Sequence, residues 1–291
     1  MSRRFLRFAL VFFAVAWLAG CSGMRIAYNN ADSILRWMAD DYFALEGAQE
    51  DDFKARLARF HAWHRSRELA RYSVLLTSAG DKLADGLTAQ ELLWALDAVK
   101  ARFRRLAANA APELAAVLCT LTPAQFEHLH KKFAESNAEY TRKNVKGGEQ
   151  EQRKRRGKRN LDLMREWFGH LSDAQEARLN AWNDKMPLLY ELRLQNRQRR
   201  QSEFAALLRQ CRGAAELEPG LRHWLIEWNA GANAEYRRLS DIHQEQYIQM
   251  LLELDRGITP AQRAHAVFRL NEYAELFKAL AEQAKPAGAD S

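Results

Sequence analysis

The 291-residue sequence is poor in β-branched residues, with only 6 isoleucines, 7 valines and 6 threonines. These residue types favour strands, whereas the Ala, Leu, Glu, Arg and Gln that abound here favour helices. The sequence also lacks the sustained alternation of apolar and polar residues that a half-buried strand requires. We therefore expect an all-α fold with no sheet.

Signatures of common enzymes are missing as well. The chain has no G-x-S-x-G, H-E-x-x-H, P-loop or Rossmann glycine motif. Hydrophobic residues make up 47% and charged residues 28%, which is typical of a globular protein and excludes general disorder. We therefore expect a folded protein that is not an enzyme, with no catalytic residue, metal or cofactor.

Residues 1–20 have the layout of a secretory signal, with three arginines before an apolar run from Phe8 to Leu18. This run is too short to span about 30 Å of hydrocarbon as a helix. The following Leu18-Ala19-Gly20-Cys21 resembles the lipobox of bacterial lipoproteins. The resemblance implies diacylglycerol transfer to the Cys21 thiol, cleavage before Cys21 and N-acylation. An uncleaved membrane anchor with an incidental cysteine is the alternative.

The residue after the lipid-attachment cysteine is Ser22, whereas inner-membrane lipoproteins of enterobacteria typically carry Asp there. The same resemblance therefore implies sorting to the outer membrane, facing the periplasm. Two or more acyl chains anchor a protein almost irreversibly. Nucleic acid is not expected as a partner in that compartment. The expected partners are the membrane, through the acyl chains, and an envelope protein or an unfolded client.

Two cysteines remain in the mature chain, Cys119 and Cys211. The periplasm permits disulfides, and a bridge here would contribute up to ~4.5 kcal/mol in the chain-entropy model. Two separate buried thiols are the alternative, because the sequence does not show whether the two Cα atoms approach each other.

Apolar residues recur at helical spacing along most of the chain, and residues 220–255 form the longest predicted helix. The pattern predicts roughly seven to nine amphipathic helices in one elongated or two-part helical bundle. The expected division is a lipoprotein signal peptide at 1–20, an N-terminal helical half at 21–145, a basic linker or frayed helix at 146–160, a C-terminal helical half at 161–285 and a disordered tail at 286–291.

The expected linker lies within residues 143–160, which have the weakest signal for an ordered helix. Three glycines interrupt the segment, six basic residues lie within 153–159, and no hydrophobic face is present. A solvated charge run is the plain interpretation. The functional alternative is an anion-binding patch that docks the protein on an envelope machine.

Three short segments share the pattern of a helix start: Leu121 to Gln125, Leu171 to Gln175 and Ile258 to Gln262. The hydroxyl residue of each is the expected N-cap and the glutamine the expected N3 residue of a capping box. The residues concerned are Thr122, Gln125, Ser172, Gln175, Thr259 and Gln262. Replacing a capping threonine by alanine should cost ~1 kcal/mol, and replacing a glutamine should cost less.

The same pattern resembles the L-T-x-x-Q signature of the Spy and CpxP family of periplasmic all-α proteins. For Spy, that resemblance implies ATP-independent chaperoning by a concave helical surface. Capping accounts for every residue of the pattern without a client protein.

A second resemblance covers residues 18–76. Its motifs are Tyr28-Asn29-Asn30-Ala31-Asp32, Trp37, the segment from Asp40 to Phe43, and Trp63-His64-Arg65. They are similar to a family of uncharacterised proteobacterial lipoproteins, in which these motifs follow the lipobox. That family has no assigned activity, so the resemblance implies only the cellular location and the helical architecture.

One cluster that suggests chemistry is His61, His64 and Glu68, which lie close together on one predicted helix. Such a trio can supply metal ligands, and it supports an alternative in which the chain is an enzyme or a metal-dependent protein. Because His64 also lies on an apolar stripe, a packed or hydrogen-bonded histidine is the plain interpretation.

Overall fold

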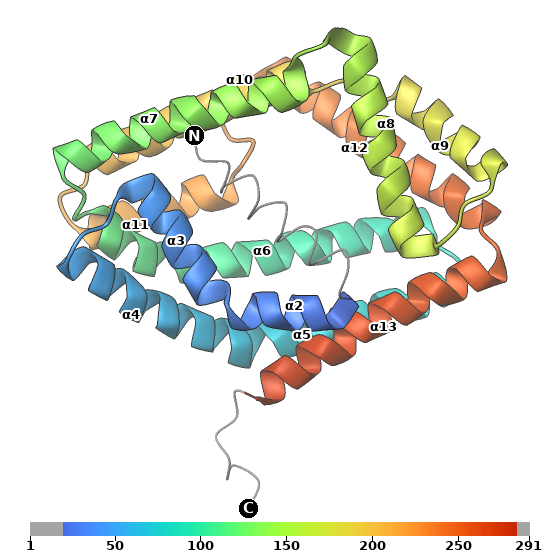
Figure 1. The fold of residues 1–291 in the computed structure, drawn as a ribbon, viewed down its shortest axis with the longest axis horizontal. Coiled ribbons are helices and arrows are strands. Elements are labelled where there is room, and N and C mark those ends of the chain that lie inside the picture. The colour runs from blue at the N-terminus through green and yellow to red at the C-terminus, as the bar shows by residue number, and fades with distance from the viewer. Residues whose placement is uncertain (1–19, 284–291) are drawn as a thin grey trace, which may run out of the picture. The chain divides into compact units, whose positions relative to one another are not determined.

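A computed structural model describes residues 20–283, and every regular element in this part of the chain is helical (Figure 1). The expected all-α fold is confirmed. The elements are α2 (Gly20–Asn29), α3 (Ala31–Phe43), α4 (Ala48–Trp63), the π-helical turn η1 (His64–Glu68), α5 (Leu69–Ala84), α6 (Ala89–Leu118), α7 (Pro123–Tyr140), the π-helical turn η2 (Thr141–Val145), α8 (Gly148–Phe168), α9 (Asp173–Lys185), α10 (Tyr190–Arg209), α11 (Ala214–Ile226), α12 (Ala234–Gly257) and α13 (Pro260–Glu282).

The expected number of seven to nine helices is wrong. Because α4, η1 and α5 run on without a break, the described residues form eleven continuous helices. Part of the difference lies in residues 220–255, expected as one helix. The chain breaks between α11 and α12, where Gly231 has a φ of +70° and the Asn233 side chain accepts a hydrogen bond from the Glu235 amide. This cap starts a new helix.

The chain divides into two compact units, and both differ from the expected halves at 21–145 and 161–285. Unit 1 contains residues up to 78 and from 270 onward, and unit 2 contains residues 79–269. The predicted signal peptide, apart from Gly20, and the tail at 286–291 lie outside the described residues. None of the helices described is long and apolar enough to cross a membrane.

The core of unit 1 is formed by leucines from α5 and α13. Leu69, Leu276 and Leu280 are almost fully buried, and aromatic side chains pack around them. One of these is Tyr28 of α2, so the first described helix contributes to the packing around this core. This packing holds helix α2 against the rest of unit 1.

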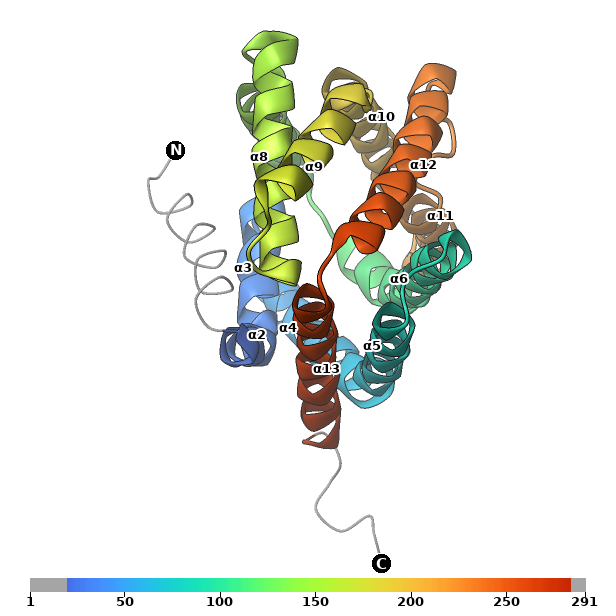
Figure 2. The same ribbon diagram turned by 90° about the vertical axis from the view of Figure 1, so that its right-hand side faces the viewer.

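A core cluster of unit 2 lies where α8, α9 and α12 meet. Met164, Leu179, Met186 and Met250 are at most 4% exposed. Figure 2 shows α9 running beside α12 in this part of unit 2. Elsewhere in the unit, α6 packs along α11 with a face of buried alanines.

The segment expected as a linker or frayed helix at 146–160 is mostly an ordered helix. Helix α8 begins at Gly148 and continues to Phe168, and Gln152 and Arg156 are buried within it. The missing hydrophobic face is replaced by buried polar contacts, so the interpretation as a solvated charge run does not hold for Arg156.

Candidate functional site

Three side chains of unit 1 form a hydrogen-bonded row, which we call the His64 cluster: Tyr28, His64 and Tyr72. The Tyr28 hydroxyl lies 2.8 Å from His64 Nδ1, and the Tyr72 hydroxyl lies 3.3 Å from His64 Nε2. A neutral imidazole has one N–H donor and one acceptor nitrogen. One tyrosine therefore donates its hydroxyl proton to the ring, and the other accepts a proton from it.

The π-helical turn η1 places His64 and Tyr72 on one line. In a regular α-helix, residues eight positions apart differ by about 80° around the axis. A π turn takes up one extra residue, which reduces the difference to about 20°. Helix α4 brings His64 to the turn and α5 carries Tyr72 away from it. The local departure from α-helical geometry thus allows the imidazole to bridge two tyrosines.

Burial favours the uncharged forms of His64 and Tyr28. It lowers the pKa of His64, against the opposing effect of the Glu68 carboxylate. It also raises the pKa of Tyr28 to about 12, although Arg65 partly offsets this. The Arg65 guanidinium stacks over the Tyr28 ring at 5.2 Å and donates to the Asn29 side chain. Motifs 36 residues apart are therefore joined by both a hydrogen bond and a cation–π contact.

The trio considered as metal ligands is held by other partners. Both ring nitrogens of His64 face tyrosine hydroxyls, and the fully buried Glu68 accepts from Arg71 Nη1 at 2.8 Å. The His61 ring packs against Tyr28 with a centroid distance of 5.0 Å. Over the described residues, no group of three or more His, Cys, Asp or Glu side chains is placed to hold a metal ion. The cluster is built as a connection between α2 and α5.

The glutamine-containing segments all begin helices with two reciprocal hydrogen bonds. The amides of Gln125, Gln175 and Gln262 donate to the capping hydroxyls of Thr122, Ser172 and Thr259 at 3.2–3.3 Å. In return, each glutamine Oε1 accepts from the N-cap amide at 2.8–2.9 Å. These capping boxes account for all three segments locally.

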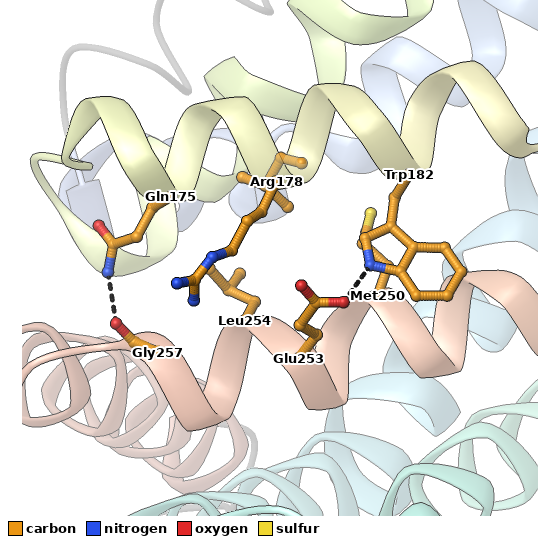
Figure 3. A pocket seen from close by; sticks show the side chains of 8 residues that line it. Gln175, Arg178, Trp182, Met250, Glu253, Leu254 and Gly257 are labelled. Carbon is orange, nitrogen blue, oxygen red and sulfur yellow. Dashed lines mark hydrogen bonds between the residues drawn. The ribbon is translucent and has the colours of Figure 1, made fainter.

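Two of the boxes are also linked across unit 2, at one end of a small pocket between α9 and α12 (Figure 3). Gln175 Nε2 donates to the Gly257 carbonyl at 2.8 Å, and Trp182 Nε1 donates to Glu253 at 2.7 Å. The pocket has a volume of about 10 Å³, which is room for about one water molecule. It is a packed helix contact and not a site for a ligand.

A larger, open groove lies between α7 and α10 of unit 2, which we call the α7–α10 groove. Its volume is about 560 Å³, and its lining mixes apolar and polar groups such as Phe133, Thr141 and Ser202. Across it, the Asn137 side chain donates to Gln201 Oε1 at 2.7 Å and accepts from Arg197 Nε at 2.9 Å. The exposed Gln198 and Ser202 side chains of the lining can hydrogen-bond a peptide or a helix of a partner.

The basic segment at 153–159 is occupied by internal contacts. Arg156 donates to the carbonyls of Asn183, Met186 and Pro187 at 2.6–2.9 Å. Arg153 donates to the Met186 carbonyl at 3.2 Å. These carbonyls end α9 and carry the negative end of its dipole, where a guanidinium is favourable. Arg155 donates in the same way to the Lys146 carbonyl after η2. The docking interpretation of this segment is therefore not supported for these three arginines.

The structure joins Cys119, at the end of α6, to Cys211, just after α10, in a disulfide with a Cα–Cα distance of 5.7 Å. The two residues are 92 positions apart in the sequence. The alternative of two separate buried thiols is not what the structure contains. The bridge fixes the ends of α6 and α10, and α11 begins three residues after Cys211.

The fold and these contacts define an all-helical protein. The His64 cluster, two of the capping glutamines, the arginines of α8 and the disulfide all connect helices of the protein to one another. Residues 41–237, well over half of the chain, match the model described as "Family of unknown function (DUF6279)". The chain therefore belongs to that family, in agreement with the expectation of an uncharacterised family. The match includes His64 and Tyr72 but begins after Tyr28. No curated protein and no solved structure matches the chain.

Proposed function

We propose that the protein is a lipid-anchored envelope protein, attached to the outer membrane through acyl chains on Cys21 and facing the periplasm. The observation that carries this proposal is the disulfide between Cys119 and Cys211. Structural disulfides persist in oxidising compartments such as the periplasm and are rare in the cytosol. The short apolar run and the Leu18-Ala19-Gly20-Cys21 sequence supply an address that agrees with that compartment.

Within the envelope, we propose a non-enzymatic role in which the helical body binds or scaffolds another envelope protein through the α7–α10 groove. Support comes from the open shape of the groove and from its exposed polar side chains, which suit a folded partner. Client holding by the glutamine segments is less well supported. Gln175 and Gln262 are buried in contacts with each other, so their side chains are not offered to a client.

The anchoring part of the proposal is tested by comparing the wild type with Cys21→Ser in the native host. Mass spectrometry of the wild-type N-terminus should find acyl chains on Cys21, and density fractionation should find the protein with the outer membrane. The variant should accumulate as precursor or lose that location. A wild-type N-terminus that carries no acyl chains contradicts the proposal, as does a fully reduced Cys119–Cys211 pair in freshly trapped cells.

The partner part is tested by placing a photo-crosslinking amino acid at Ala138, which lines the α7–α10 groove. The matched control is the same amino acid at Ala177, an exposed alanine of α9. A discrete crosslinked envelope protein at Ala138 and none at Ala177 supports the groove. Equal crosslinking at both positions contradicts it. Strong suppression of client aggregation at stoichiometric ratios without ATP would favour a chaperone role instead.

A further inference from the structure

Exposed apolar side chains gather on the first two described helices. Among the described residues, four of the ten exposed large hydrophobic side chains lie within residues 26–38. They are Ile26 at 59%, Leu35 at 41%, Trp37 at 48% and Met38 at 46% exposure. The remaining six are scattered over residues 74–268. We call these four residues the N-terminal apolar patch.

Helix α3 is amphipathic, and three of its apolar side chains are 41–48% exposed. Trp37, Met38 and Leu35 fall within an arc of about 160° around the helix axis, and Ile34 and Asp41 lie within the same arc. Asp32 and Arg36 lie on the other side, where they form an ion pair of 3.7 Å. A helix of a globular protein ordinarily buries its apolar stripe in the core. In α3 only Ala39 is buried, and Leu35, Trp37 and Met38 remain partly exposed.

The patch follows the proposed lipid-attachment residue directly. Helix α2 begins at Gly20, and Ile26 lies five residues after Cys21, which is about 8 Å along a helix. Tyr28 fixes α2 to unit 1 through His64 and the leucine core. With acyl chains in the bilayer at Cys21, this short, packed connection leaves no long linker to carry the patch away from the lipid surface.

We infer that the N-terminal apolar patch lies on the phospholipid surface to which Cys21 is attached, so that α3 is an interfacial helix. This inference rests on the proposed acylation. Trp prefers the membrane interface, and amphipathic helices lie in the interface plane with their apolar face buried. The charged residues of α3 are Asp32, Arg36, Asp40 and Asp41, so its net charge is negative. Apolar insertion rather than attraction to anionic lipids holds the helix, and high salt should not release it.

The test uses the acylated full-length mature protein in vesicles of phosphatidylethanolamine and phosphatidylglycerol with brominated acyl chains. Tryptophan quenching is compared between the wild type, Trp37→Phe and Trp228→Phe. Trp228 is the matched control because it is 53% exposed and lies outside the patch. We expect the brominated lipids to quench the Trp37 share of the emission by about half or more, at low and high salt alike. The Trp228 share should stay unquenched.

A second variant, Leu35→Asp with Met38→Asp, replaces two partly exposed residues, and its thermal unfolding is measured to check that it keeps its fold. It should lose the Trp37 quenching while the acyl chains keep the protein in the vesicles. An acylated, vesicle-bound wild type in which Trp37 is quenched no more than Trp228 overturns the inference and leaves the anchor standing. Mass spectrometry that finds no acyl chains, or an uncleaved N-terminus, overturns both. Crosslinks between two copies at Met38→Cys, with Trp37 unquenched, would assign the patch to a dimer.

Discussion

The side-chain amides of Gln175 and Gln262 form a reciprocal pair, with each Nε2 donating to the other Oε1 at 2.9 and 3.0 Å. Each Nε2 also donates to a backbone carbonyl two residues before the other N-cap, at Gly257 and His170. The two capping boxes are thus joined by a contact with local two-fold character. Each glutamine therefore hydrogen-bonds the N-cap amide of its own helix and a backbone carbonyl in the segment that leads into the other helix.

This pair reverses the expected order of the capping substitutions. We predict that Gln175→Ala and Gln262→Ala each lower the free energy of unfolding by about 2–3 kcal/mol, because each leaves buried polar groups without partners. Ser172→Ala should cost ~1 kcal/mol. In urea unfolding, the double glutamine variant should lose less than the sum of the single losses. Additive losses would contradict the pair. Glu91→Ala, in the exposed box at Thr88, is the control and should cost less than either glutamine.

Removing the Tyr28 hydroxyl should loosen α2. We predict that Tyr28→Phe destabilises unit 1 by about 1–2 kcal/mol, since it leaves a half-buried imidazole nitrogen without its partner. The amides of α2 should exchange faster with solvent deuterium. Tyr72→Phe is the matched comparison and should have a smaller effect, because that hydrogen bond is 3.3 Å rather than 2.8 Å. Unchanged exchange in α2 after Tyr28→Phe would count against the connecting role of the cluster.

Arg156 should be among the most sensitive positions of the basic segment. We predict that Arg156→Lys lowers the free energy of unfolding by about 2–4 kcal/mol, because a single ammonium cannot reach the carbonyls that the planar guanidinium bonds together. Lys158→Ala is the control, since the Lys158 side chain is 75% exposed and should be replaceable without measurable change. Similar thermal midpoints for the two variants would show that the arginine is dispensable.

His243 should make the protein less stable as the solution becomes acidic. Burial, together with Arg193 and Arg156, lowers its pKa from 6.5 to about 4, and the ring stacks on Tyr247 at 6.3 Å. The unfolded chain therefore binds a proton first as the pH falls. The contribution is complete above about pH 6.5 and is lost progressively towards pH 4. Since the ring is partly solvated, we expect about 1–2 kcal/mol.

The variant His243→Gln isolates this contribution from the carboxylates that titrate in the same range. Urea unfolding at pH 7 and pH 4.5 should give a smaller pH-dependent loss for the variant than for the wild type. If the free energy of unfolding falls by the same amount between pH 7 and pH 4.5 in both proteins, the pKa of His243 is not lowered in the folded state.

Local sequence signals predicted the elements that depend on neighbouring residues. Ser172 and Thr259 begin helices where their hydroxyl-to-glutamine spacing indicated, and the scarcity of β-branched residues indicated the all-α fold. The contact between Gln175 and Gln262 could not be predicted, because 87 residues separate them and each already had a local role. Long-range partners of this kind leave no trace in periodicity.

The basic segment shows a different reason for error. Its acceptors are backbone carbonyls at the end of α9, which any residue type carries, so nothing in the sequence marked them as partners of Arg156. The π turn at His64 could not be predicted from the sequence either, because no residue type marks the extra residue that changes the angle around the helix axis. Only the residue types of the His64 cluster were noticeable in advance.

The internal use of the arginines in α8 also determines how the native chain meets a protease. Trypsin cleaves after Lys and Arg, and six such residues lie within 153–159. A protease must draw several residues into an extended strand, and this requires local unfolding. In this segment, local unfolding would break the hydrogen bonds from the arginines to the carbonyls at the end of α9. It would also break the backbone hydrogen bonds of α8. The segment with the highest density of trypsin cleavage sites is therefore protected until this part of unit 2 unfolds. The rate at which trypsin cleaves it reports that unfolding.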